Sequence, residues 1–175
     1  MFKLKHIAPT EAQGTVKDVY DAFPPQVGIP EPMQMFSISP GLQHAQMEVL
    51  KYYMGHSRLE FPLLAAARYM AASRFGYDYC VDFNAGLLQA AGMLPAQIEM
   101  LQSELDGNLD DFPFDERELD MLRLVRKVID RPEEVGDADV AKVRSAGWSD
   151  ADIFDVCANA AMLQGTGTLF KAFRN

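Results

Sequence analysis

Apolar residues repeat at helical spacing along most of the chain. Residues 40–54 carry an apolar side chain at every third or fourth position, and Leu119, Leu122 and Val125 form one stripe in a second segment. No stretch shows a strict alternation of apolar and polar residues that outweighs the helical pattern. The pattern therefore predicts an all-α fold, a compact bundle of about seven or eight helices.

Local signals predict where these helices begin and end. The predicted starts are Thr10 (with Gln13), Pro40, Leu59, Tyr77, Pro95, Asp115 (with Glu118), Asp137 and Ser149. The predicted ends are Gly55, Gly76, Gly92 and Gly147, with Gly165 and Gly167 interrupting the last helix. Between residues 24 and 40, prolines predict an ordered loop that packs on the body, with one helical turn around residues 33–36. Residues 106–111 predict a solvated acidic loop.

The segment 59–75 is apolar on nearly all sides, which is typical of a central, buried helix. No internal repeat or low-complexity linker divides the chain, and 175 residues fall within the usual size of one domain. We therefore expect a single helical domain spanning residues 1–175.

The net charge restricts the kinds of macromolecule that the protein can bind. Sixteen Lys and Arg residues against 25 Asp and Glu give a net charge of -9. Such a surface opposes nucleic acid and anionic membrane as main partners, because both need a basic face. Two cysteines fit a reducing compartment, and neither a leader nor a membrane-spanning apolar segment is visible. The expected location is the cytoplasm.

Candidate chemistry gathers around Cys80. Tyr77, Cys80 and Asn84 fall at i, i+3 and i+7, on one face of a helix. Cys80 is either a reactive thiol or a buried small hydrophobe, and we favour burial and slow reaction with peroxide. Cys157 lies on the apolar stripe of the last helix and reads as core. A disulfide between Cys80 and Cys157 requires that their helices touch.

Other candidate sites have plainer explanations. His44 with Glu48 and His56 with Glu60 have i, i+4 spacing suitable for a metal, but we favour solvated surface pairs and predict no metal. The ten methionines fit a core or a subunit interface better than a ligand pocket or an oxidation buffer. The sequence Gly-Thr-Gly at 165–167 follows no strand and lacks a lysine, so it is not a phosphate loop. No cofactor is predicted.

Several separated segments together resemble the alkylhydroperoxidase D and carboxymuconolactone decarboxylase family. They are GTVKDVY at 14–20, GIPEPMQMF at 28–36, SPGL at 39–42, DEREL at 115–119 and VAKVRSAGWSDADI at 140–153. The resemblance covers nearly the whole chain and implies an alkylhydroperoxidase D-like helical fold. It also implies a homo-oligomer, a trimer or a hexamer. The apolar helix, the small-residue last helix and the proline loop independently suggest surface that an oligomer would cover.

The resemblance centres on residues 77–84, where peroxidase members carry a Cys-x-x-Cys-x-x-x-His motif. An acidic residue twelve positions before the first cysteine completes their proton relay. Only Cys80 matches, at the position of the peroxide-attacking cysteine. Tyr77 replaces the first cysteine, Asn84 the histidine and Ala65 the acid. The decarboxylase members rely on a histidine in this region, and this helix has none.

These observations support three hypotheses about function. The first is a divergent protein of thiol-peroxidase or antioxidant ancestry, with weakened or lost peroxidase chemistry at Cys80. The second is a non-catalytic oligomer that binds a small hydrophobic or aromatic ligand in the former active-site pocket. The third is an enzyme acting on a lactone or carboxylate, using Arg74, Tyr77 or Tyr79.

Overall fold

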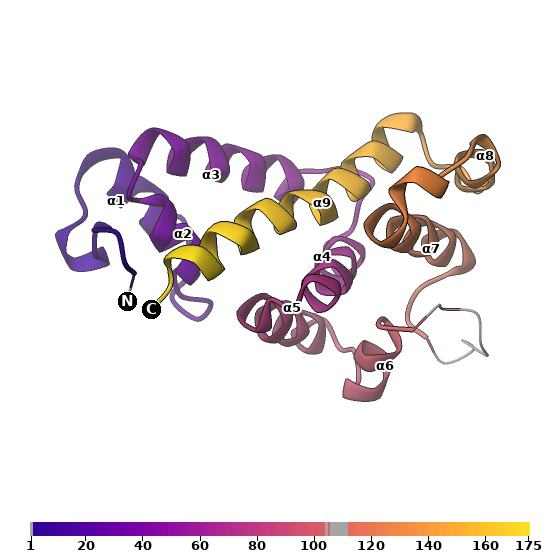
Figure 1. The fold of residues 1–175 in the computed structure, drawn as a ribbon, viewed down its shortest axis with the longest axis horizontal. Helices are drawn as coiled ribbons and strands as arrows, with labels where there is room; N and C mark the ends of the chain where they lie inside the picture. Colours follow the sequence, from indigo (N-terminus) through magenta and orange to yellow (C-terminus); the bar gives the residue numbers. More distant parts are fainter. Residues whose placement is uncertain (1, 104, 106–111) are drawn as a thin grey trace. The chain divides into compact units, whose positions relative to one another are not determined.

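The computed structural model describes residues 2–103, 105 and 112–175, and this part of the chain is helical (Figure 1). It contains nine α-helices and two short 3-10 helices, and its only β-type pairing is an isolated bridge between Phe2 and Arg174. The all-α prediction is confirmed. The count exceeds eight because the turn expected around residues 33–36 forms a helix of its own. The loop predicted at 106–111 lies outside the described residues.

The chain divides into two compact units. One comprises Met1–His56 with Thr168–Asn175, and the other comprises Ser57–Gly167. The expectation of one domain over residues 1–175 stays a prediction.

The first unit contains η1 (Pro9–Glu11), α1 (Gly14–Asp21), α2 (Glu31–Phe36) and α3 (Pro40–Met54). Its core joins Val16, Val19 and Tyr20 of α1 to Met47 of α3. The Tyr20 hydroxyl donates to the Ile7 carbonyl at 2.8 Å. Residues of the proline-rich segment, Ile29 and Met33, pack against this core, as the sequence predicts.

The predicted helix start at Thr10 is wrong. Residues 9–11 form a 3-10 turn, after which Ala12 and Gln13 are extended. Gly14 has φ +52°, a left-handed conformation that glycine adopts without strain. These extended residues separate the turn from α1, so the helix begins at Gly14, about one turn later than the capping signal at Thr10 indicates.

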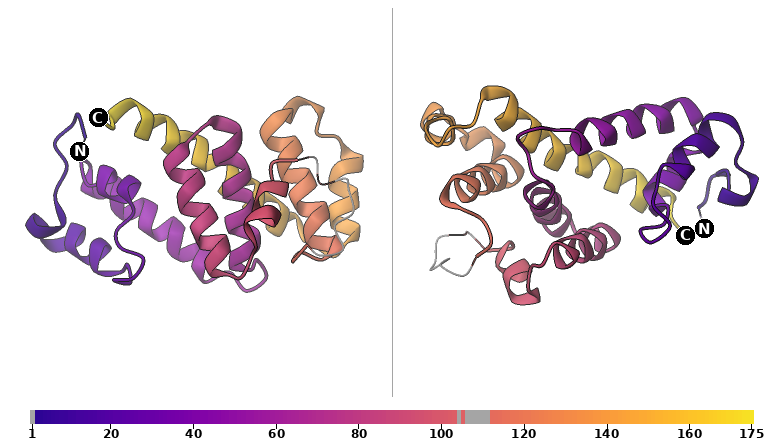
Figure 2. Two further views of the ribbon diagram at one scale, coloured as in Figure 1. Left: turned by 90° about the horizontal axis from the view of Figure 1, so that it is seen from below. Right: turned by 180° about the vertical axis from the view of Figure 1, so that it is seen from behind.

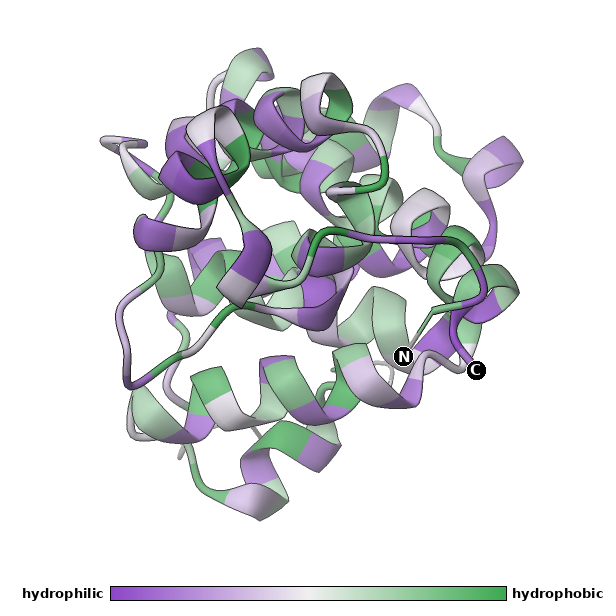
Figure 3. Ribbon diagram, turned by 90° about the vertical axis from the view of Figure 1, so that its left-hand side faces the viewer, coloured by the Kyte–Doolittle hydropathy of each residue, from purple (hydrophilic) through white to green (hydrophobic). Residues whose placement is uncertain are grey.

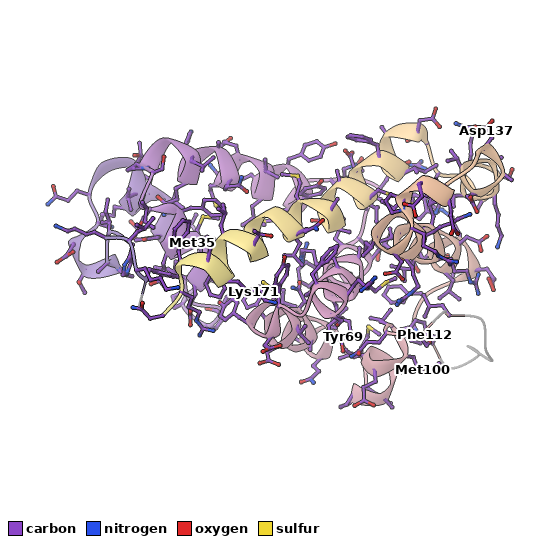
Figure 4. All side chains as sticks on the ribbon, in the orientation of Figure 1. Met35, Tyr69, Met100, Phe112, Asp137 and Lys171 are labelled. Carbon is purple, nitrogen blue, oxygen red and sulfur yellow. The ribbon has the colours of Figure 1, made fainter. Side chains whose placement is uncertain are left out.

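The second unit is built around α4 (Phe61–Phe75). Nine of its 15 residues are buried, because α5 (Asp78–Ala90) and α7 (Glu116–Asp130) pack against it. Figure 2 shows α4 and α5 running alongside each other. On a further side, the Tyr69 hydroxyl (labelled in Figure 4) accepts a hydrogen bond of 2.6 Å from Gln102, just after α6 (Pro95–Met100). The central, buried helix predicted from the sequence is confirmed.

The rest of this unit is η2 (Pro132–Glu134), α8 (Asp137–Ser145) and α9 (Asp150–Phe173), of which residues up to Gly167 belong here. The capping box of α7 is confirmed: Asp115 accepts from the Glu118 amide at 2.8 Å, and Glu118 accepts from the Asp115 amide at 3.1 Å. Ser149 likewise accepts from the Asp152 amide at the start of α9.

Four predicted boundaries shift. The helices expected from Leu59 and Tyr77 begin at Phe61 and Asp78, because the preceding residues are extended or serve as the N-cap. Asp137 is the first residue of α8 rather than its cap. Gly136 is the N-cap, and its amide donates to the Asp139 carboxylate at 2.8 Å. The last helix continues through Gly165 and Gly167 to Phe173, since packing outweighs the low helix propensity of glycine.

Hydrophobic and hydrophilic residues alternate along the helices, as expected where one side of each helix is buried (Figure 3). Among the described residues, no helix combines the length and the apolar character needed to cross a membrane.

Candidate functional site

The candidate site is built on the turn between α4 and α5. Gly76 ends α4 at φ 63° and ψ 49°, a left-handed cap that accommodates glycine. Tyr77 follows as the N-cap of α5, and its amide donates to the Ala72 carbonyl at 2.9 Å. This tight reversal brings the first turn of α5 against the last turns of α4.

Tyr77 is fixed by α9. Its hydroxyl donates to the Gln164 carbonyl at 3.1 Å. Its ring lies directly over Gly167: a Cβ added at that glycine would be 2.2 Å from two ring carbons. The bare backbone at Gly167 thus lets α9 approach the Tyr77 ring closely, whereas nothing lies within 4 Å of a Cβ added at Gly165.

Cys80 is buried beside this ring. It is 4% exposed and packs in one cluster with Ala72 and Tyr77. Burial raises the pKa of the Cys80 thiol, so the thiolate is disfavoured at neutral pH. The predicted burial of Cys80 is confirmed.

Asn84 is held by hydrogen bonds to the Cys80 backbone and to Arg68. It is 2% exposed, its amide nitrogen donates to the Cys80 carbonyl at 2.8 Å, and its oxygen accepts from Arg68 Nε at 2.9 Å. Arg68 Nη1 also lies 3.4 Å from the Asn159 oxygen, and Asn159 donates to the Leu64 carbonyl at 3.1 Å. The half-buried Arg68 and the buried Asn84 and Asn159 thus form one network across α4, α5 and α9, which we call the Arg68 network.

Ala65 is fully buried in α4, one turn before Arg68. Its methyl group cannot accept or donate a proton. The structure therefore brings Tyr77 and Cys80 together and ties Asn84 to the Cys80 backbone, while Ala65 contributes only packing on the adjoining helix. The catalytic roles of these four positions stay predictions.

Neither Arg68 nor Asn159 is among the residues predicted from the sequence. A signal for Arg68 was present, because it is the one charged residue between Phe61 and Ser73 in a helix predicted to be buried. Arginine in such a place is nearly always paired. Asn159 carries no comparable signal, since asparagine in a long helix is more often solvated.

The other candidate groups are engaged elsewhere. Arg74 Nε pairs with Asp130 at 2.6 Å, and Tyr79 stacks on Phe83 with ring centroids 6.1 Å apart. Cys80 and Cys157 are both free thiols. Cys157, predicted to lie in the core, is only half-buried, and burial raises its pKa to about 11.

The two predicted pairs, His44 with Glu48 and His56 with Glu60, belong to no metal site within the described residues. Glu48 forms an ion pair of 2.8 Å with Lys51. No group of three or more His, Cys, Asp and Glu side chains in the described part of the chain is arranged to hold a metal ion.

Comparison with known proteins identifies the fold. No protein-family model and no curated protein matches the chain. Among solved structures, the chain is similar to a protein from Silicibacter sp. TM1040 described as an uncharacterized peroxidase-related protein. The TM-score is 0.75 at 19% identity, over 98% of this chain and 92% of that one.

A second similar structure, from Ralstonia eutropha JMP134, is described as an alkylhydroperoxidase AhpD core and an uncharacterized peroxidase-related protein. Its TM-score is 0.71 at 18% identity, over 90% of this chain and 80% of that one. The chain thus has an alkylhydroperoxidase D-like fold, as the sequence resemblance implies.

Proposed function

We propose that the protein is a divergent alkylhydroperoxidase D-like protein of thiol-peroxidase ancestry whose peroxidase chemistry at Cys80 is weakened or lost. One observation carries this proposal: the thiol is buried and its pKa is raised, while the neighbouring polar side chain, Asn84, is an amide that cannot take up a proton. A thiol attacks peroxide as its thiolate, so a site that disfavours the thiolate and lacks a base reacts slowly.

The surroundings of Cys80 support the same conclusion. Tyr77 stands where the resemblance puts the first cysteine of the motif, and its hydroxyl donates to the Gln164 carbonyl. A tyrosine cannot resolve a sulfenic acid by disulfide formation. The description of both structural neighbours as peroxidase-related supports the ancestry.

The first test is hydrogen peroxide consumption with a dithiol reductant. We expect the unmodified protein to react no faster than a free thiol, and Cys80→Ser to leave that rate unchanged. A rapid reaction that Cys80→Ser abolishes would contradict the proposal. A thiol titration with Cys80 largely ionised at neutral pH would contradict it as well.

The second test rebuilds the relay with Ala65→Glu, Tyr77→Cys and Asn84→His. Cys80 as thiolate attacks one peroxide oxygen and breaks the O–O bond, giving a sulfenic acid and, after protonation, water. The thiol at position 77 then attacks the Cys80 sulfur, forming a disulfide and releasing a second water. The dithiol reduces this disulfide and returns the site to its starting state. The new imidazole accepts the thiol proton, and the new carboxylate orients it.

We expect measurable turnover in the triple variant and little in partial variants, because groups that act together are strongly non-additive. Adding Cys80→Ser to the triple variant is the matched control and must abolish turnover. A folded triple variant without any gain would mean that the backbone no longer supports the relay. It would favour the alternative of a non-catalytic protein that binds a small hydrophobic or aromatic ligand in the former active-site pocket.

The lactone or carboxylate hypothesis receives less support. Arg74 is paired with Asp130, and the Tyr77 hydroxyl donates to the Gln164 carbonyl. Both groups would have to leave these partners to act on a substrate. A thermal-shift screen of small lactones and aromatic compounds, run beside the peroxide assay, separates these alternatives.

We also propose that the protein is a homo-oligomer, in line with the trimers or hexamers implied by the resemblance. Large apolar side chains are exposed in both compact units: Leu42, Tyr52 and Met54 in the first, and Phe61, Leu94, Phe154 and Met162 in the second. These side chains are available for contacts between subunits. Light scattering that returned a particle of 19.5 kDa at micromolar concentration would refute the oligomer.

A further inference from the structure

A small apolar hollow lies between α7, α8 and α9, within the second compact unit. Its volume is about 250 Å³, and its lining includes Val128, Val135, Val140, Ile153, Phe154 and Cys157. Three of these are valines on separate segments, all only half-buried, and Phe154 is 71% exposed. Apolar side chains around an open hollow are hydrated at a free-energy cost, which an apolar occupant would remove.

The hollow is separate from the Cys80 site. Successive residues of a helix are about 100° apart, so Cys157 and Asn159 of α9 face roughly opposite directions. Asn159 bonds to Leu64 of α4, whereas Cys157 lines the hollow with α7 and α8. A ligand in the hollow would therefore leave the Arg68 network untouched.

The lining of the hollow also includes a charged side chain, Arg144, whose guanidinium has more hydrogen-bond donors than its ion pair uses. Arg144 and Asp150 both line the hollow, and Arg144 Nε and Nη2 both contact the same Asp150 oxygen, at 2.9 and 2.7 Å. No described residue pairs with Nη1 of Arg144. Guanidinium groups bind carboxylates with strong, charge-assisted hydrogen bonds. Asp150 already holds the Nε side of the guanidinium, so a ligand carboxylate beside the apolar interior would bind at Nη1, away from Asp150.

The volume restricts the occupant. A cavity of about 150 Å³ holds a benzene molecule, so this hollow suits one ring, or a short branched chain, together with a small polar group. A stable protein partner buries about 800 Å² per side, far more than the hollow offers. We propose that the hollow is a binding site for a small amphipathic carboxylate, with the apolar group among the valines and the carboxylate at Arg144.

Benzoate and benzyl alcohol are matched probes, because they share the ring and differ in the carboxylate. In a Cys80→Ser variant Cys157 is the only thiol, and its alkylation by iodoacetamide at one mildly alkaline pH reports access to the hollow. We expect saturable protection of Cys157 by benzoate, with weaker protection by benzyl alcohol. Benzoate should also raise the melting temperature of the unmodified protein.

Two variants with matched controls locate the ligand. Arg144→Gln should weaken benzoate about tenfold and leave benzyl alcohol unchanged, as expected for one lost charge-assisted contact. Its control is Arg131→Gln, another exposed arginine in an ion pair, with Glu134. Val140→Phe should fill the hollow and abolish binding of both probes, whereas Ala141→Phe, at an exposed position of α8, should not.

Several results would overturn the proposal. One is alkylation of Cys157 that is unaffected by either probe up to its solubility limit. Equal loss of benzoate binding in Arg144→Gln and Arg131→Gln would show a nonspecific charge effect. Protection of Cys157 that depends on protein concentration but not on benzoate would mean that a second copy of the chain covers the hollow.

Discussion

Replacing Gly167 with alanine should destabilise the protein, although alanine is the better helix former. The new methyl group would lie 2.2 Å from the Tyr77 ring, so the ring must move and its bond to the Gln164 carbonyl is lost. Overpacking costs about 1–3 kcal/mol, and the lost hydrogen bond about 1 kcal/mol more. The gain in helix propensity offsets about 1 kcal/mol. The expected net loss is therefore roughly 1–3 kcal/mol.

Gly165→Ala is the matched control, two residues earlier in the same helix. Nothing lies within 4 Å of its added Cβ, so only the helix propensity changes. We expect a gain of about 1 kcal/mol, and hence a difference of roughly 2–4 kcal/mol between the two variants. Urea unfolding followed by circular dichroism measures both, with the slope of each transition used to check that the unfolded state is unchanged.

A double-mutant cycle identifies the cause. In a Tyr77→Ala background the ring is absent, and Gly167→Ala should become stabilising. In a Cys157→Ser background, Gly167→Ala should also speed the alkylation of Cys80, because Tyr77 and Cys80 belong to one cluster. A Gly167→Ala protein as stable as Gly165→Ala would refute the close contact between the ring and α9.

Two further predictions concern the ends of helices. Asp115→Ala removes the side chain that accepts from the Glu118 amide, and should cost about 1 kcal/mol in urea unfolding. Burial of Asp152 disfavours its charge, but hydrogen bonds from Ser149 and Arg58 outweigh burial and lower its pKa. The stability from this carboxylate is present above the unfolded pKa of about 4 and is lost as pH falls through the lower folded pKa. Asp152→Asn should lower the free energy of unfolding by roughly 1–3 kcal/mol at neutral pH. The variant should also lose less stability than the parent on acidification. An equal loss in both proteins would show that Asp152 does not cause this pH dependence.

Those helices whose ends are set by neighbouring residues could be predicted from the sequence. Pro40 begins α3 and Gly55 ends it, and the pair Asp115 and Glu118 begins α7. Pro40 acts through its fixed φ, and the other signals act through hydrogen bonds to residues at most four positions away, so no knowledge of the tertiary structure is needed. The same applies to Gly76, whose left-handed conformation ends α4.

Features that depend on distant residues could not be predicted in this way. Gly165 and Gly167 read as helix breakers, but α9 continues through them. The Tyr77 ring needs the bare backbone at Gly167, 90 positions away in sequence, and only the folded chain reveals that need. The helical spacing of residues 77 and 80 correctly groups Tyr77 with Cys80. The hydrogen bond between Asn84 and Arg68 joins two different helices, so spacing within one helix does not predict it.

Tyr77 and Asn84, which replace the cysteine and the histidine of the motif, each contact a second residue. Restoring the relay therefore requires more than exchanging these two side chains. A cysteine at 77 would leave a gap over Gly167, where the tyrosine ring now packs. A histidine at 84 would face the Arg68 guanidinium, which now donates to Asn84. A nearby positive charge lowers the pKa of an imidazole and weakens it as a proton acceptor. A glutamate at 65 lies one helical turn before Arg68, at a spacing that allows an ion pair between them. The carboxylate at 65 would then screen the arginine from the new imidazole as well as orient it, so we expect Asn84→His to gain activity only when Ala65→Glu accompanies it.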